Sequence, residues 1–283
     1  MAERVRVVYR DGMSLTVSDT GPAEGRVAVL LHGFPQDASC WTALSPSLHD
    51  VGVRTVAPDQ RGYSSGARPR GSAGYRFAEL VADTLAVADA AGADTFDVVG
   101  HDWGATVAWA LAAAAPERVR TLTALSVPHP AALRASLAHG QAMRSWYMGL
   151  FQVPGLAERV VRPGSWFWSQ VVRGLPAEAA QRYATRMSEP GALTGALSWY
   201  RMLPSEFRHP SIPVGRIRVP TLMVWGTRDP ALGRWAAEHT GDYVVGDYRF
   251  VPLEGAGHWL PETRADAVAD ALVPHLSNGR GAV

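Results

Sequence analysis

The chain has 283 residues, enough for one large α/β domain or for a core that carries an insertion. Its composition, 47% hydrophobic and 19% charged, is that of an ordinary globular protein. The net charge of +1 excludes the strong electric field that nucleic-acid binding or an anionic membrane would need, so neither is expected as a partner.

The first ten residues carry several charges and lack the apolar stretch of a signal peptide. No stretch approaches the ~20 apolar residues of a membrane span. The single cysteine, Cys40, excludes an internal disulfide framework and fits a reducing compartment. We therefore expect a cytoplasmic protein, either a monomer or a homodimer.

Strand patterns alternate with helix patterns along most of the chain. The hairpin signal Asp11-Gly12 separates the first two strands, and continuous apolar runs predict later strands that are buried on both faces. This alternation predicts an α/β fold with a mostly parallel, eight-stranded sheet. The expected strands are Val5–Tyr9, Ser14–Ser18, Val27–Leu31, Arg54–Ala57, Phe96–Val99, Leu122–Ser126, Thr221–Trp225 and Tyr248–Leu253. The expected helices between and after them are Phe77–Ala91, Ala105–Ala115 and Arg264–Leu276.

One long segment breaks the alternation. From about Pro128 to Pro213 there is no buried-strand run, and helical patterns rich in tryptophan, tyrosine and phenylalanine are separated by Pro-Gly pairs. We interpret residues 129–212 as a helical cap inserted into a core made of residues 1–128 and 213–283. A cap over the carboxyl ends of parallel strands would enclose an apolar pocket.

The most informative motif is Gly100-His101-Asp102-Trp103-Gly104, which lies between an expected strand and an expected helix. Strand, Gly-x-nucleophile-x-Gly and helix form a nucleophile elbow, in which the glycines let backbone and helix approach closely. The central residue here is Asp102, whose carboxylate can attack an sp³ carbon and form an alkyl ester. The alternative is that Asp102 is a solvated residue that caps the following helix.

His258 and Asp229 are the candidate partners of Asp102. His258 follows the last strand, where a neutral imidazole could activate water against the ester. Asp229 follows the strand Thr221–Trp225, where a carboxylate could orient the imidazole, although an aspartate before Pro230 could simply open a turn. The order nucleophile, acid, base along the chain is the one that accompanies a nucleophile elbow.

The loop His32-Gly33-Phe34-Pro35 follows the strand Val27–Leu31. Backbone amides of Phe34 and Trp103 could form an oxyanion hole, since one donor follows the nucleophile and the other comes from this earlier loop. The alternative is a tight Gly-Pro turn. His32 is better explained as a hydrogen-bonded structural residue than as a base.

These motifs together resemble the epoxide hydrolases of the α/β-hydrolase fold over nearly the whole chain. The matching pieces are His32–Pro35, Ala57–Tyr63, Gly100–Gly104, Gly257–Trp259, Leu197–Arg201, and Trp146-Tyr147 ahead of Phe151–Gly155. The resemblance implies that Tyr200, and through a weaker match Tyr147, donate hydrogen bonds to the epoxide oxygen. Ser198 stands where the family often has Asn.

The resulting hypothesis is hydrolysis of an epoxide to a vicinal diol. Asp102 attacks the epoxide while Tyr147 and Tyr200 act as acids, and His258 with Asp229 then activates water against the Asp102 ester. The partners would be a small hydrophobic epoxide and water, with no cofactor and no metal, because no zinc-type ligand cluster is present. We expect the substrate pocket to be lined by Trp199, Trp146, His32, Pro35 and Trp259.

Two alternatives remain at this stage. A haloalkane or haloacid dehalogenase would also use Asp102, but Phe34 and Trp103 stand where those enzymes usually carry a halide donor or a carboxylate-binding arginine. A catalytically silent α/β-hydrolase that binds a ligand is the second alternative, because fold does not imply function.

Overall fold

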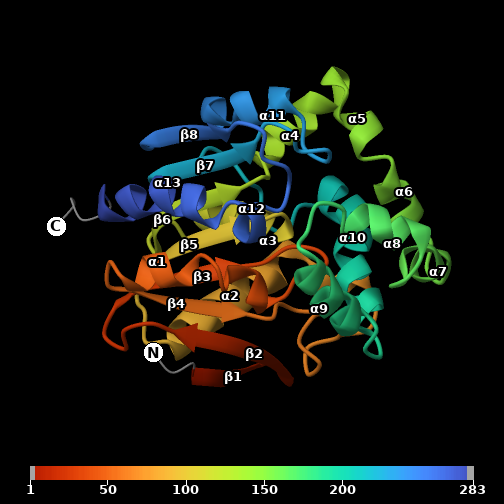
Figure 1. The fold of residues 1–283 in the computed structure, drawn as a ribbon, viewed down its shortest axis with the longest axis horizontal. Coiled ribbons are helices and arrows are strands. Elements are labelled where there is room, and N and C mark those ends of the chain that lie inside the picture. The colour runs from red at the N-terminus through yellow and green to blue at the C-terminus, as the bar shows by residue number, and fades with distance from the viewer. Residues whose placement is uncertain (1–3, 279–283) are drawn as a thin grey trace.

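The computed structural model describes residues 4–278, and its centre is a single eight-stranded sheet (Figure 1). The strand order is β1-β2-β4-β3-β5-β6-β7-β8. Strands β1 and β2 form an antiparallel hairpin, β2 pairs antiparallel with β4, and every other pairing is parallel. The bounds are β1 Arg4–Arg10, β2 Met13–Thr20, β3 Arg26–Leu31, β4 Val53–Pro58, β5 Phe96–His101, β6 Val119–Leu125, β7 Thr221–Gly226 and β8 Tyr248–Leu253. The expected α/β fold with a mostly parallel sheet is confirmed.

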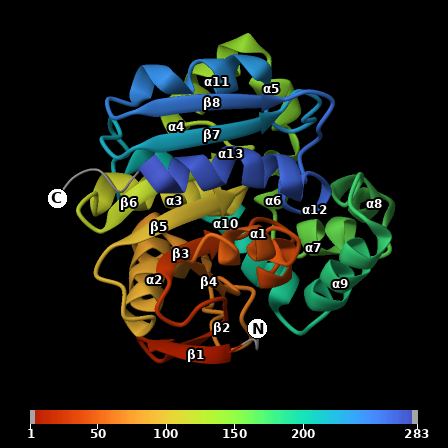
Figure 2. The same ribbon diagram turned by 60° about the vertical axis from the view of Figure 1, so that its left-hand side comes forward.

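Helices cover both faces of this sheet (Figure 2). Helix α2 (Phe77–Ala90) packs beside α3 (Trp103–Ala114), and α1 (Ser45–His49) packs beside α13 (Ala265–Asn278) on the other side. Shorter core elements are η1 (Ala38–Trp41), η2 (Ser72–Tyr75), α11 (Arg234–Glu238), η4 (Thr240–Tyr243) and α12 (Leu260–Thr263). Because both faces are covered, residues along the central strands are buried almost without interruption rather than alternating between buried and exposed.

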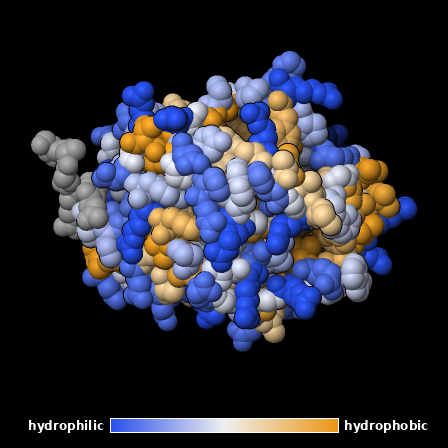
Figure 3. Space-filling view, turned by 90° about the horizontal axis from the view of Figure 1, so that it is seen from above, coloured by the Kyte–Doolittle hydropathy of each residue, from blue (hydrophilic) through white to orange (hydrophobic). Residues whose placement is uncertain are grey.

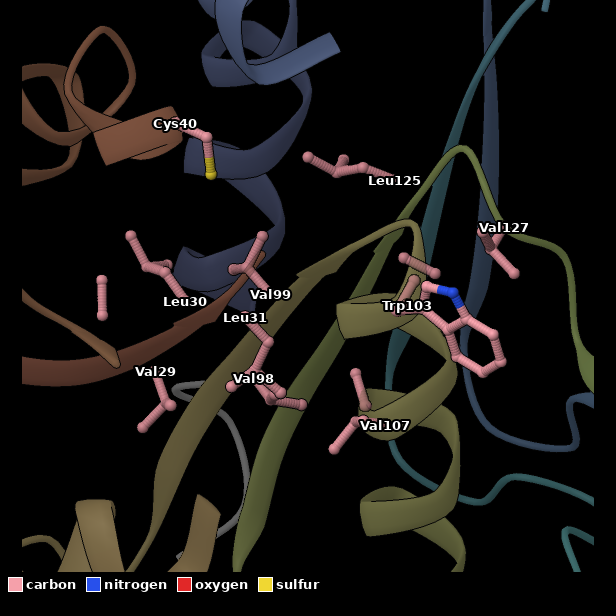
Figure 4. Close-up of a cluster of buried hydrophobic side chains, with 14 of the residues drawn as sticks. Val29, Leu30, Leu31, Cys40, Val98, Val99, Trp103, Val107, Leu125 and Val127 are labelled. Carbon is pink, nitrogen blue, oxygen red and sulfur yellow. The ribbon is translucent and has the colours of Figure 1, made fainter. Parts of the chain in front are cut away.

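Figure 4 shows the result for the strands that carry the site. Leu31 of β3, Val99 of β5 and Leu125 of β6 are completely buried, and Val107 of α3 packs beside them. Trp103, at the first turn of α3, closes the same cluster at the carboxyl end of the strands. The backbone at these strand ends is therefore fixed by close packing.

A run of helices connects β6 to β7 and lies at the carboxyl-terminal side of the sheet, at the right of Figure 1. Its first helix, α4, packs beside α11 of the core, and the others extend over the strand ends. We call this run the cap; its expected bounds, 129–212, stay a prediction. The elements are α4 (Pro130–Ala135), η3 (Ser136–His139), α5 (Gln141–Arg144), α6 (Tyr147–Phe151), α7 (Leu156–Val161), α8 (Trp166–Val171), α9 (Ala177–Met187) and α10 (Ala192–Arg208).

The cap also carries much of the exposed apolar surface. Met143, Trp146 and Trp166 are 83%, 65% and 75% exposed. Hydrophobic residues gather at the end of the molecule where Figure 1 places the cap helices, as the space-filling view shows (Figure 3). None of the helices described for residues 4–278 is long and apolar enough to span a bilayer.

Candidate active site

Asp102 stands at a strained turn between β5 and α3. Its backbone has φ 52° and ψ −121°, a combination that non-glycine residues rarely adopt. The turn is tight, because a Cβ on Gly104 would lie 1.9 Å from the carbonyl oxygen of Leu31. The Asp102 side chain makes no capping hydrogen bond to α3, which removes the alternative of a simple helix cap. Its carboxylate instead faces the loop that follows β3.

The loop after β3 approaches that carboxylate directly. The backbone amide of Phe34 donates a 2.8 Å hydrogen bond to Oδ1 of Asp102. The approach requires glycine at position 33, because a Cβ there would lie 2.3 Å from the Cβ of Asp102. A backbone donor aimed at one carboxylate oxygen has the geometry of an oxyanion hole. The contribution expected from the Trp103 amide stays a prediction.

His258 lies between the two aspartates. Its Nδ1 is 2.7 Å from Oδ2 of Asp229, and its Nε2 is 3.5 Å from Oδ2 of Asp102. Asp229 also opens a turn, since its Oδ1 accepts from the amides of Ala231 and Leu232 at 2.8 and 3.0 Å. One oxygen of Asp229 therefore orders its own loop, while the other lies within hydrogen-bond distance of the imidazole.

The charges around His258 set its protonation state. Burial disfavours the imidazolium, but the carboxylates of Asp229 and Asp102 outweigh it and raise the pKa of His258 to about 10. The reverse influence lowers the pKa of Asp102 despite its burial. At neutral pH the site therefore holds two carboxylates with an imidazolium between them.

A buried polar network behind Asp102, His258 and Asp229 was missed by sequence reasoning. The Gln36 side chain accepts from the Gly33 amide at 2.8 Å, and the same oxygen is 2.8 Å from Nδ1 of His101. Nε2 of His101 is in turn 2.9 Å from the carbonyl oxygen of His258. Gln36 also donates to Glu262, which accepts a bond from Tyr183 of the cap. One amide thus links the loops that carry Phe34, Asp102 and His258.

Two cap tyrosines lie near Asp102. Tyr200 of α10 is 4% exposed, and its ring is 4.9 Å from that of Trp103 and 5.7 Å from that of Phe34. The ring of Tyr147, on α6, is 6.3 Å from that of Tyr200. Burial raises the pKa of both phenols, and the negative charge of Asp102 raises it further. Both hydroxyls therefore stay protonated at neutral pH and can donate.

The Asp102 side chain stays 19% exposed although it lies beneath the cap. Aromatic rings lie near it, and Phe151, which sequence reasoning did not single out as a pocket residue, is one of them, 4.8 Å from Tyr200 and 6.2 Å from Phe34. An apolar wall with few polar groups suits a hydrophobic substrate.

Two of the expected pocket residues have other surroundings, and their place in a substrate pocket stays a prediction. Trp146 is 65% exposed, and its ring lies 6.1 Å from that of Phe167. His32 is completely buried, with Nε2 accepting from the Gln60 amide at 3.1 Å and Nδ1 2.9 Å from the carbonyl oxygen of Gly33. His32 therefore joins two core loops through its ring nitrogens.

The other three expected pocket residues are buried beside the site. Trp199 packs 5.7 Å from Trp103, and its indole donates to the carbonyl oxygen of Arg61. Trp259 lies against the ring of His258 at 5.0 Å, and Pro35 is buried next to Phe34. Their direct contact with a substrate stays a prediction. Among residues 4–278, no group of three or more His, Cys, Asp or Glu side chains is placed to hold a metal ion.

Comparison with known proteins agrees with this geometry. The sequence model of the α/β hydrolase fold matches residues 27–265. Epoxide hydrolase A of Mycobacterium tuberculosis is 33% identical over 96% of this chain and 97% of its own length. The solved epoxide hydrolase A from Mycobacterium thermoresistibile is 30% identical, with a TM-score of 0.87 over 98% of both chains. A mutant epoxide hydrolase from Bacillus megaterium, solved with its product (R)-3-[1]naphthyloxy-propane-1,2-diol, is 25% identical, with a TM-score of 0.85 over 96% of this chain and all of that one.

The class follows from the fold and the comparisons: this is a hydrolase built on a mostly parallel sheet, with a sharp Gly-x-Asp-x-Gly turn between β5 and α3. The chain belongs to the α/β-hydrolase fold family and, within it, to the epoxide hydrolases.

Proposed function

We propose that this enzyme opens epoxides to vicinal diols through an alkyl ester on Asp102. The observation that carries the proposal is the placement of the two Asp102 oxygens: Oδ1 accepts from the Phe34 amide, while Oδ2 lies 3.5 Å from His258. Oδ2 is therefore the attacking oxygen. Oδ1 becomes the carbonyl oxygen of the ester and stays in the oxyanion hole.

In the first step Oδ2 forms a bond to an epoxide carbon and that carbon's bond to the ring oxygen breaks. The ring oxygen leaves as an alkoxide and takes a proton from Tyr147 or Tyr200. The raised pKa of both phenols makes them weak acids, but an alkoxide is a stronger base than a phenolate, so the transfer is favourable.

In the second step the loss of charge on Asp102 activates His258. Ester formation removes one of the two carboxylates that hold the pKa of His258 high, so the imidazolium becomes a stronger acid and can return a proton to the phenolate. The neutral imidazole, oriented by Asp229, then takes a proton from water that attacks Cγ of Asp102. The bond between Cγ and Oδ2 breaks, and the leaving Oδ2 takes the proton of the hydroxyl that water added to Cγ. The diol leaves with Oδ2, and Asp102 is again a carboxylate beside the imidazolium of His258.

The site favours this chemistry over the two alternatives. A dehalogenase needs donors for a halide, whereas the cap places two phenols beside Asp102 that can protonate an alkoxide. A silent binding protein has no need of a strained aspartate or of an imidazole held between two carboxylates. The aromatic wall, together with the naphthyloxy diol product of the Bacillus megaterium relative, favours a small aryl epoxide as substrate.

Mass spectrometry of a trapped intermediate tests the proposal. In a His258→Gln variant mixed with styrene oxide, the protein should gain the mass of one epoxide, located on the peptide that contains Asp102. The matched control is His49→Gln, which changes a histidine far from the site and should turn over without accumulating the adduct. Absence of an adduct in His258→Gln, with diol still formed, would refute the ester route.

A further inference from the structure

Helix α5 joins the cap to the loop that carries Asp229. The helix spans Gln141–Arg144, and Gln141 is its one buried residue, 3% exposed. Gln141 Nε2 donates to the carbonyl oxygen of Ala231 at 2.7 Å, and Gln141 Oε1 accepts from the Gly233 amide at 2.9 Å. One side-chain amide therefore pairs with two backbone groups of the loop that follows Asp229.

Arg144 adds a second connection to the same loop. Its guanidinium donates to the carbonyl oxygens of Asp229 and Pro230 at 3.2 and 2.9 Å. Its side chain is on the surface, whereas Gln141 is enclosed. A buried hydrogen-bonded amide fixes geometry more strictly than an exposed cation does, because leaving either of its partners unpaired is costly.

The same helix leads directly to Tyr147. The Ser145 amide donates to the carbonyl oxygen of Gln141, and the Met148 amide donates to that of Ser145. Tyr147 therefore begins α6 at the end of a continuous hydrogen-bonded chain that starts at Gln141. At the far end of α6, the Gln152 side chain donates to the carbonyl oxygen of Tyr200. The start of α6 is thus connected through α5 to the loop that follows Asp229, and its end is bonded to α10.

We propose that Gln141 is a positioning residue for Tyr147, setting the distance between its phenol and the Asp102–His258–Asp229 site during epoxide opening. The inference rests on the proposed function, in which Tyr147 donates to the epoxide oxygen. The loop has supports of its own, since Asp229 Oδ1 binds two of its amides and Trp225 donates to the carbonyl oxygen of Leu232. Loss of Gln141 should therefore displace Tyr147 more than Asp229.

A double-mutant cycle on the rate of ester formation tests the proposal. With styrene oxide in single turnover, Gln141→Leu should slow ester formation about ten-fold, because small displacements of a catalytic group are costly. Ester hydrolysis, which does not use Tyr147, should change less than two-fold. In a Tyr147→Phe background, Gln141→Leu should have almost no further effect, because the hydroxyl that it positions is gone.

The matched control is Met143→Ala, on the same helix but at an 83% exposed position. It should leave the rates of ester formation and of ester hydrolysis unchanged. Equal losses from Gln141→Leu in both backgrounds, or slower hydrolysis instead of slower ester formation, would overturn the positioning role alone. An unchanged rate in Tyr147→Phe would overturn the role of Tyr147 in the proposed function, and with it the inference. If Gln141→Leu does not fold, Gln141→Glu, which keeps the acceptor for Gly233 and loses the donor to Ala231, takes its place.

Discussion

Asp102, Asp229 and His258 follow the ends of β5, β7 and β8, whereas Tyr147 and Tyr200 come from cap helices. The core residues are held by close approach of backbone: the Phe34 amide contacts Asp102 directly, and Gln36 ties the surrounding loops together. The cap residues are held by side-chain hydrogen bonds to the core. Gln141 donates to the carbonyl oxygen of Ala231 in the loop after Asp229, and Trp199 donates to the carbonyl oxygen of Arg61.

In the proposed mechanism, the two steps of the reaction depend on different parts of the molecule. Ester hydrolysis would need only core groups, which are set by a packed sheet. Ester formation would also need the two phenols, whose place is set by polar contacts between cap and core. Changes in the core should therefore act on hydrolysis, and changes in the cap on ester formation.

The largest effect is expected in the core, from Asp229→Asn. The amide cannot stabilise the imidazolium or hold the imidazole in the correct tautomer, so ester hydrolysis should fall by about 10³–10⁴-fold. Ester formation should fall far less, and the ester should accumulate in a rapid-quench experiment. Asp242→Asn, on the surface near β8, is the control; an equal loss in both steps would contradict the division between core and cap.

The next largest effect is expected in the cap, from Tyr200→Phe and Tyr147→Phe. Each removes one acid for the leaving oxygen, so single-turnover ester formation should fall by about 10²-fold. Hydrolysis of the ester should be nearly unchanged. Tyr9→Phe, on the exposed strand β1, serves as the control. A loss confined to hydrolysis would show that the phenols do not act in ring opening.

A smaller effect is expected on the pH dependence of stability. The pKa of His258 is about 10 in the folded protein and near 6.5 in the unfolded chain, so the folded state holds the proton more tightly. This contribution is fully present below about pH 6.5 and is lost as pH rises through about 10. Melting temperatures measured between pH 7 and 10 should therefore fall less steeply in Asp102→Asn than in the wild type. Equal slopes in the two proteins would contradict the stabilisation of the His258 imidazolium by the Asp102 carboxylate.

The smallest effect is expected from Trp199→Phe, which removes one bond between cap and core. The buried Arg61 carbonyl loses its donor, at a cost of about 1 kcal/mol, equivalent to roughly 2 °C in melting temperature. Trp166→Phe, on the exposed face of the cap, should not shift the transition. A similar shift in melting temperature in both variants would show that the hydrogen bond from the Trp199 indole to Arg61 does not stabilise the contact between cap and core.

The same contrast explains what the sequence could predict. Buried parallel strands appear as continuous apolar runs, and Gly-x-Asp-x-Gly is a local signal, so the sheet and the elbow were predictable. Asp229 and His258 followed from their places after strands. The distance of 2.7 Å between Nδ1 of His258 and Oδ2 of Asp229 could not be predicted, because it depends on how β7 and β8 pair.

The rest depends on contacts between distant segments. Gln36 and His101 are 65 residues apart, and Gln141 reaches a loop 90 residues away, so no local pattern reveals them. In the cap, Trp146 and Tyr147 are neighbours, but α6 has only five residues and too little periodicity to show which of the two faces inward. The structure turns Tyr147 toward Tyr200 and Trp146 toward solvent.

The origin of the diol oxygen tests the central claim most directly. Wild-type enzyme in excess over styrene oxide, in oxygen-18 water, should release first-turnover diol that carries unlabelled oxygen from Oδ2 of Asp102, while the label enters the carboxylate. Diol labelled from solvent in that first turnover would mean that water attacks the epoxide directly, and would contradict the account of Asp102 as the nucleophile.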